Sequence, residues 1–293
     1  LNILHGKGYV INNFNTDYYS YGYPGHPLFL VVSHILLKSN YFLFAVTQII
    51  LLLAAFYLIY LTAKKIFGER AALVSLFLMA THPGLIVYAT RIHEINLVIL
   101  LIALTVWFIS SLDWTKIRDN VLLGSLIGVG ALTRPTLIFF LPVYFLYLRW
   151  RSVKMRNLVK AFLIVLVSAF FVLSPWILRN YHIHKRWIFI ATTSAEHFWR
   201  GNSQFSSGTG LTPDNRAIID VAPKEFLSKL YKMNEIEQYD LFYRETLDFI
   251  KSHPATFIKM IFKKIFYFWW FSPQTGLWYP QLWAVLYKAY YSV

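Results

Sequence analysis

The stretch Tyr88-Ala-Thr-Arg-Ile-His-Glu-Ile-Asn96 separates two apolar runs, residues 71–80 and 97–109. Runs of this composition predict helices in a membrane, so the stretch between them is expected at the mouth of a helical hairpin. Charged side chains are costly at that depth. This short stretch nevertheless contains Arg91, His93 and Glu94.

The sequence is compatible with two roles for Glu94. Arg91 lies three residues before it, so on a helix the two side chains would share a face and could form an ion pair. One reading is therefore an interfacial salt bridge that caps the hairpin. The other is a carboxylate in a functional site, because an ionisable group at membrane depth is a functional candidate by default.

The composition places the chain among membrane proteins. Of its 293 residues, 57% are hydrophobic and 19% aromatic, while only 14% are charged, against roughly a quarter in soluble domains. The net charge of +14 suits loops beside anionic lipid, or a site that handles phosphate, rather than nucleic acid. The absence of cysteine excludes disulfides and thiolate metal sites.

The order of apolar and polar segments predicts an all-α polytopic membrane protein with four regions. Residues 1–38 form a first outer loop and an interfacial helix at 28–38, and residues 39–178 form a transmembrane bundle of about six spans. Residues 179–254 form an outer soluble segment that is partly helical. Residues 255–293 form an aromatic interfacial helix and the start of a further span. The expected spans are 41–63, 71–88, 96–112, 121–132, 136–148 and 161–177.

Positive charge predicts the orientation of the bundle. The turns at 64–70 and 116–118 and the run 149–160 are basic and fall on one face, which is cytoplasmic by the positive-inside rule. Arginine binds phosphate through a planar fork, so arginines on the outer face suit a lipid-linked phosphate, with snorkelling to headgroups as the alternative. The helix ends on that face carry Arg91, Arg134 and Arg179.

Other side chains on the outer face suggest sugar or metal chemistry. Trp199 offers a flat surface for a sugar ring and Asn202 a partner for hydroxyls, although a structural turn is equally open. A metal site of His93 or His197 with Glu94 is conceivable, but no ligand spacing such as HExxH supports it. A divalent metal stays open, and no cofactor is required. No Walker loop or Rossmann fingerprint is present, which argues against a nucleotide-sugar donor.

Six short motifs follow one another in an order that resembles a family of membrane enzymes. They are Gly6-Lys-Gly-Tyr9, Tyr23-Pro-Gly-His-Pro-Leu-Phe29, Arg91-Ile-His-Glu94, Gly128-Val-Gly-Ala-Leu-Thr-Arg-Pro135, Pro175-Trp-Ile-Leu-Arg-Asn180 and Trp199-Arg-Gly-Asn202. Together they resemble the GT-C glycosyltransferases. The branch is glycosyltransferase family 39, with the protein O-mannosyltransferases, or dolichyl-phosphate-mannose-protein mannosyltransferases, and the lipid A aminoarabinose transferase. The resemblance implies a GT-C-like transmembrane helix bundle.

The resemblance also implies a reaction. Such an enzyme moves a sugar from a polyprenyl-phosphate donor, undecaprenyl or dolichyl, to a glycan, lipid or protein acceptor on the outer side of the membrane. Its partners would be this donor, the acceptor and the membrane lipids, and not nucleic acid. An acidic residue in the first outer loop would activate the acceptor hydroxyl, because a hydroxyl is a poor nucleophile at neutral pH.

The sequence departs from the family at its ends. The first span of the family and its acidic motif would precede Leu1, and further spans would follow Val293. We therefore expect an internal fragment that is inactive alone. Asp17 lies in the loop that carries the family base, and Glu94 matches the second outer acid, so these two are the catalytic candidates within the chain.

Motif positions assign further roles as hypotheses. The donor phosphate would contact Arg91, Arg134 and Arg179. The sugar and the acceptor would contact His26, Asn180, Trp199 and Asn202.

Two other classes of protein remain open. A transporter or flippase of a lipid-linked anion would need an inverted repeat and broken helices at mid-membrane, and neither is visible. A non-catalytic membrane scaffold would tolerate replacement of the outer arginines. The expected location is a bacterial or archaeal inner membrane, with the site facing outward. The sugar, the acceptor and the oligomeric state do not follow from the sequence.

Overall fold

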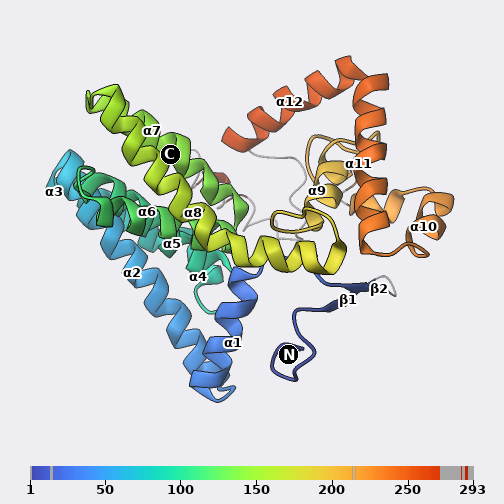
Figure 1. The fold of residues 1–293 in the computed structure, drawn as a ribbon, viewed down its shortest axis with the longest axis horizontal. Helices are drawn as coiled ribbons and strands as arrows, with labels where there is room; N and C mark the ends of the chain where they lie inside the picture. The colour runs from blue at the N-terminus through green and yellow to red at the C-terminus, as the bar shows by residue number, and fades with distance from the viewer. Residues whose placement is uncertain are drawn as a thin grey trace. The chain divides into compact units, whose positions relative to one another are not determined.

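The computed structural model describes residues 2–13, 16–212, 214, 216–270, 285 and 288–289. Across these residues the chain runs through helices α1 to α12 and one short β-hairpin (Figure 1), so the predicted all-α class is confirmed. The chain forms two compact units. The first is Tyr23–Ile190, and the second combines Asn2–Gly22 with the described residues from Ala191 onward. The further span predicted near the end of the chain lies mostly outside the described residues.

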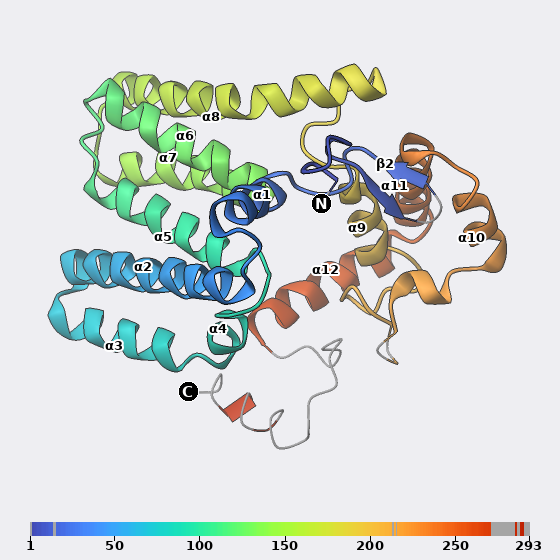
Figure 2. The same cartoon turned by 90° about the horizontal axis from the view of Figure 1, so that it is seen from below.

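The first unit is a layered bundle of helices. Its elements are α1 (Gly25–Leu37), α2 (Tyr41–Phe67), α3 (Glu69–Thr81), α4 (Pro83–Tyr88), α5 (Ile95–Ser111), α6 (Ile117–Thr133), the 3-10 helix η1 (Pro135–Phe139), α7 (Phe140–Trp150) and α8 (Met155–His184). Figure 2 shows α3, α2, α5, α6 and α8 side by side in that order, and each neighbouring pair in this series is in contact.

Two helices of this unit, α2 and α8, are long and apolar enough to cross a membrane. α1, α5 and the segment Pro135–Trp150 are apolar but shorter. Large apolar side chains of α2 and α8 remain exposed, among them Phe42, Tyr57 and Phe171. A contiguous apolar surface is rare on soluble monomers and suits contact with lipid.

Residues 71–88 do not form the single span that we predicted. Helix α3 ends at Thr81, His82 is extended, with φ −66° and ψ 116°, and α4 begins at Pro83. Proline has no N–H to continue a helix and disfavours helical geometry in the residue before it. The dipeptide His82-Pro83 therefore divides the segment in two.

Helices α6 and α8 approach each other closely through two glycines. A Cβ atom on Gly124 would stand 2.3 Å from the carbonyl oxygen of Val165, and one on Gly128 would stand 2.8 Å from that of Ala169. The sequence Gly124-Ser-Leu-Ile-Gly128 is the small-xxx-small pattern that lets two membrane helices pack backbone to backbone. This contact sets the spacing of α6 and α8.

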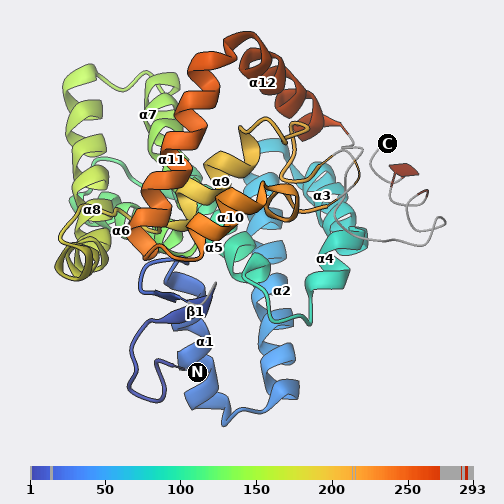
Figure 3. The same cartoon turned by 90° about the vertical axis from the view of Figure 1, so that its right-hand side faces the viewer.

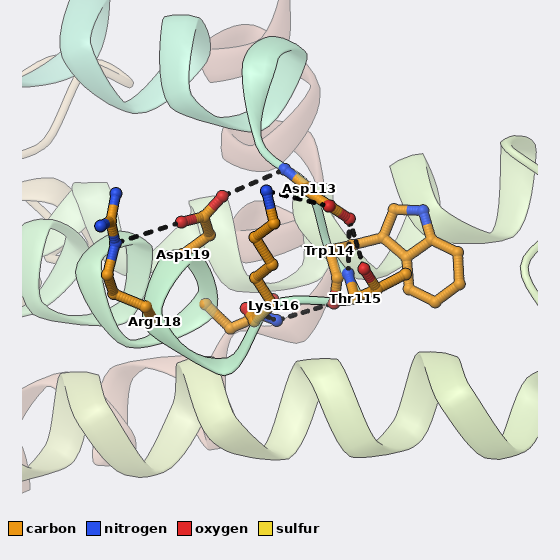
Figure 4. Close-up of polar contacts among 7 residues, drawn as sticks. Asp113, Trp114, Thr115, Lys116, Arg118 and Asp119 are labelled. Carbon is orange, nitrogen blue, oxygen red and sulfur yellow. Dashed lines mark hydrogen bonds and ion pairs between the residues drawn. The ribbon is translucent and has the colours of Figure 1, made fainter.

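Side chains hold the turn between α5 and α6 in place (Figure 4). Asp113 and Lys116 form an ion pair at 3.4 Å. Asn120 donates to the carbonyl oxygens of Trp114 at 2.8 Å and Lys116 at 3.0 Å, and accepts from the Tyr144 hydroxyl at 2.6 Å. Because Tyr144 lies on α7, this network ties the turn to a third helix.

The second unit is built around an aromatic core. Its helices are α9 (Thr193–Gly201), the 3-10 helix η2 (Ile218–Val221), α10 (Lys224–Leu230), α11 (Glu235–Ser252) and α12 (Pro254–Trp269). Figure 3 shows α9, α10 and α11 gathered together, and their inner faces supply Trp199, Leu230 and Phe242 to one buried cluster. Within the predicted, partly helical segment 179–254, α10 and α11 are separate helices, because Asn234 and Glu237 form a capping box that starts α11 anew.

Residues 1–24 are not the simple loop that we predicted. Strands β1 (Ile11–Asn13) and β2 (Thr16–Tyr18) form an antiparallel hairpin that belongs to the second unit. The buried Glu235 carboxylate accepts from the N–H groups of Tyr19 at 2.7 Å and Ser20 at 3.0 Å and from the Thr192 hydroxyl at 2.6 Å. These bonds tie the segment after the hairpin to α11, and the boundary between the two units falls after Gly22, so the predicted region of residues 1–38 is divided there.

Candidate functional site

The centre of the candidate site is an ion pair between Glu94 and Arg134 in the first unit. The Oε1 atom of Glu94 and the Nη1 atom of Arg134 are 3.0 Å apart. Glu94 precedes α5, whose positive helix end favours a carboxylate. Arg134 follows α6 in an extended conformation, with φ −149° and ψ 112°, because Pro135 comes next. The proline turns the arginine out of the helix and towards Glu94.

Arg91 is not the partner of Glu94, which corrects the predicted ion pair. Residues 89–94 form turns rather than a continuous helix, so the three-residue spacing does not place the two side chains on one face. Arg91 is exposed and forms no ion pair with the described residues of the chain. The ion pair that does form joins the beginning of α5 to the end of α6, so it links two helices rather than two residues of one loop.

Gly25 brings the beginning of α1 against the end of α6. A Cβ atom at Gly25 would stand 2.3 Å from Thr133 Oγ1 and 2.7 Å from Thr133 N, so a side chain has no room there. Tyr23 lies just before this contact. Burial raises its pKa, the Glu94 carboxylate raises it further and the Arg134 guanidinium opposes the rise. Both charges of the ion pair therefore act on the Tyr23 phenol.

His26, the residue after Gly25, contributes a buried ring nitrogen to the site. Its Nε2 atom is buried and has no partner among the described residues. Burial, and to a smaller degree His93, lowers the pKa of His26 to about 4. The ring is therefore neutral at pH 7, and its free nitrogen can bind a hydroxyl group.

Buried amides support the beginning of α5. Asn96 donates to the carbonyl oxygen of Tyr88 at 2.8 Å and to Gln48 Oε1 at 3.1 Å. Both amide side chains are almost fully buried, at 1% and 0% exposure. The Nδ1 atom of His93 accepts from the N–H of Ile95 at 3.3 Å. These contacts anchor the turn that contains Glu94 to helix α2.

Replacing Gly25 by Ala is expected to displace α1 and to disturb this site. The added methyl group would overlap the backbone of Thr133, and overpacking of this kind costs about 1–3 kcal/mol. Detergent-titrated unfolding of the full chain measures the loss of stability. Val32→Ile on the same helix is the control, because Val32 is 54% exposed and a larger side chain has room there. Equal stability of the two variants would show that the close approach at Gly25 is not needed.

Arg179 and Asn180 have structural environments elsewhere in the first unit. The Arg179 guanidinium lies 4.4 Å from the centre of the Trp176 ring, and its Nη1 donates to Asn180 Oδ1 at 3.0 Å. Asn180 is fully buried and donates to the carbonyl oxygens of Ile188 at 3.1 Å and Ile190 at 3.3 Å. Asn180 therefore secures the chain after α8, and its expected contact with a sugar or acceptor stays a prediction.

Trp199 is a core residue of the second unit, whereas the sequence left open either a surface for a sugar ring or a structural turn. Its ring is 4% exposed and stacks on Phe226, with centres 5.2 Å apart and an angle of 10° between the rings. Phe242 covers it at 5.3 Å. The amphipathic pattern of α9 and α11 was the signal for this role, because it buries one face of each helix.

The other candidates in the second unit are Asp17, His197 and Asn202. Asp17 is exposed on β2 and accepts from Asn12 Nδ2 at 2.9 Å. Asn202 is 7% exposed, and its Oδ1 accepts from Lys264 Nζ at 2.5 Å. His197 Nε2 lies 3.3 Å from the Thr193 hydroxyl. Each of these side chains has a local partner.

Within the described ranges, no group of three or more His, Asp or Glu side chains is arranged to hold a metal ion. The metal ligands considered above also fall in different units, since His93 and Glu94 belong to the first and His197 to the second.

The structure adds residues to the site that the sequence reasoning missed. Tyr23 and Thr133 lie beside the predicted His26 and Arg134, and Gln48 supports α5 from α2. Gln48 could have been identified from the sequence, because an amide inside a long apolar run needs a buried hydrogen-bond partner. Tyr23 and Thr133 lie in two of the quoted motifs, but the motifs do not show the contact between distant segments that gives these residues their place in the site.

One protein family, described as dolichyl-phosphate-mannose-protein mannosyltransferase, matches residues 23–178, which is more than half of the chain. The matched range covers most of the first unit and contains Tyr23, His26, Glu94 and Arg134. No curated protein matches the chain, and no solved structure matches it.

Proposed function

The chain belongs to the dolichyl-phosphate-mannose-protein mannosyltransferase family, and we propose that it transfers a sugar from a polyprenyl phosphate to an acceptor hydroxyl on the outer face of a membrane. Membership confirms the resemblance to GT-C glycosyltransferases and identifies a membrane glycosyltransferase that uses a dolichyl-phosphate sugar. The proposal adds a multi-pass arrangement in a bacterial or archaeal inner membrane, with the site facing outward.

The Glu94–Arg134 pair carries the proposal. Glu94 engages one nitrogen of the Arg134 guanidinium at 3.0 Å, and Arg134 remains 46% exposed, so its other N–H groups are accessible to a ligand. A guanidinium matches the geometry of phosphate oxygens, and a carboxylate partner keeps it oriented. We therefore assign Arg134 to the donor phosphate and Glu94 to the positioning of Arg134.

These roles fit the chemistry of sugar transfer from a lipid phosphate. The acceptor oxygen forms a new bond to the anomeric carbon and loses its proton to a base, while the bond from that carbon to the phosphate oxygen breaks. Negative charge then grows on the departing polyprenyl phosphate. A fixed cation stabilises that charge more in the transition state than in the bound donor. Arg134 supplies the cation, and the neutral His26 is suited to a sugar hydroxyl.

Transfer is tested with the complete gene product in proteoliposomes that contain polyprenyl-phosphate mannose and a hydroxyl acceptor, either a Ser/Thr peptide or a glycolipid. We expect release of polyprenyl phosphate and attachment of mannose to one acceptor. Donor that crosses the bilayer with its sugar still attached would instead support the transporter reading. The proposed function would be contradicted if, with every acceptor tested, the donor kept its sugar and stayed on the side of the bilayer where it was added.

A further inference from the structure

The side chain of Arg200, at the end of α9 in the second unit, is only partly engaged. Its Nη1 atom is 3.7 Å from Glu196 Oε1, and the second oxygen of Glu196 already accepts from the Tyr21 hydroxyl at 2.6 Å. The Nε atom of Arg200 is buried and has no hydrogen-bond partner among the described residues. The Glu196 contact therefore leaves the Nε–Nη2 edge of the guanidinium, whose two parallel N–H groups suit a two-oxygen anion.

A second buried donor lies three residues later. Ser203 is 4% exposed, and its Oγ atom is buried without a partner within the residues that the structure describes. Buried polar atoms in folded proteins nearly always have partners, so each exception calls for an explanation. The two exceptions lie at the end of α9 and in the bend that follows it, and each of them lacks an acceptor.

Lysines from α12 border the same loop. The Nζ atom of Lys264 contacts Asn202 Oδ1 at 2.5 Å and lies 3.6 Å from the position that a Cβ would take at Gly201. The Lys263 side chain lies 3.1 Å from the corresponding position at Gly208. Residues 201–211 contain no Asp or Glu. The loop is therefore flanked by cations and carries no carboxylate of its own.

Glycine leaves space beside these cations. A Cβ atom at Gly210 would be 3.9 Å from Arg200 Nη2, and at Gly201 it would be nearest to Lys264. A cation near the end of α9 is partly explained by the negative end of the helix dipole. That explanation accounts for Lys264, but it leaves the Arg200 Nε and Ser203 Oγ atoms without an acceptor.

We propose that the second unit binds a phosphate group through Arg200, Ser203 and Lys264. The Nε–Nη2 edge of Arg200 would donate to two phosphate oxygens, the Ser203 hydroxyl to one, and the Lys264 ammonium would balance the charge. This site lies in a different unit from the Glu94–Arg134 pair and is not assigned by the proposed transfer reaction. It is also tested without any sugar donor, so the two proposals fail separately.

Calorimetric titration of the purified full chain with inorganic phosphate, at constant ionic strength, tests the site. Arg200→Lys keeps the charge but removes the Nε–Nη2 edge, so we expect phosphate binding about tenfold weaker or more. Ser203→Ala removes one donor with little change of shape and should weaken binding in the same direction. Arg216→Lys is the matched control, because the Nε of Arg216 is already taken by Asp214 Oδ2 at 2.5 Å.

A parallel titration with farnesyl phosphate identifies the source of the phosphate. Tighter binding than inorganic phosphate, with the same loss in Arg200→Lys, supports a lipid-linked phosphate, and equal binding supports free phosphate. Near-ultraviolet circular dichroism of the aromatic side chains, compared with that of the unmodified chain, confirms that each variant is folded. The proposal is overturned if neither compound binds the unmodified chain, or if folded Arg200→Lys and Ser203→Ala bind as tightly as Arg216→Lys.

Discussion

Replacing Arg134 by Gln is expected to lower kcat/KM for polyprenyl-phosphate mannose about a hundredfold. The change removes the cation that we assign to the donor phosphate. It also leaves Glu94, whose side chain is 23% exposed, without the ion-pair partner that lies 3.0 Å away. Steady-state release of polyprenyl phosphate by the complete gene product in proteoliposomes measures the effect. Most of the loss should appear in kcat if Arg134 acts on the departing phosphate.

Controls separate this role from a general effect of charge. Arg151→Gln removes an exposed arginine outside the site and should change kcat/KM by less than about twofold. Glu94→Gln should also lower kcat/KM, and the double variant should be no worse than Arg134→Gln alone, because residues that act as a unit are not additive. An Arg134→Gln enzyme as active as Arg151→Gln would remove Arg134 from the donor site.

Replacing Gly124 by Ala is expected to destabilise the first unit by about 2 kcal/mol or more. The new Cβ would stand 2.3 Å from the carbonyl oxygen of Val165 and 2.7 Å from Ser168 Cβ, so α6 and α8 must move apart. The overlap is with backbone, which has no alternative rotamer. Their separation also breaks the packing of Leu123 and Ile127, which are fully buried. The free energy of unfolding, from titration of mixed micelles with denaturing detergent, measures the loss.

Val129→Ile on the same helix is the matched control. It also adds carbon, but Val129 is 45% exposed, so the larger side chain has room. We expect its free energy of unfolding to stay within about 0.5 kcal/mol of the unmodified chain. If Gly124→Ala were as stable as Val129→Ile, the close packing of α6 on α8 would not contribute to stability.

Local rules of sequence predicted much of the first unit. The apolar runs at 41–63 and 96–112 correspond to α2 and α5. The break between the expected spans 121–132 and 136–148 falls at Arg134-Pro135, where α6 ends and η1 begins. Proline acts on its immediate neighbours, so its effect can be read without knowing the fold. The same rule, applied to His82-Pro83, correctly divides the segment 71–88. The prediction of a single span there relied on the apolar composition instead.

The candidate site followed from sequence only in part. Glu94, Arg134 and His26 were named from charge in an apolar context and from family motifs, and the structure places them with Tyr23 around the Gly25–Thr133 contact. The pairing of Glu94 with Arg91 was wrong. A spacing of three residues implies proximity only within a helix, and the chain turns between these two residues.

The amino-acid sequence by itself determined the helical class, the long apolar helices and the family, because composition, periodicity and motif order are properties of the chain. Only the tertiary structure decided which polar side chains are exposed and which charges pair. Trp199 and Asn180 had residue types suited to a sugar, yet both are buried in structural roles. Arg134 found its carboxylate at a separation of 40 residues. Burial and pairing depend on segments that the fold brings together from distant regions of the chain, and no local pattern encodes them.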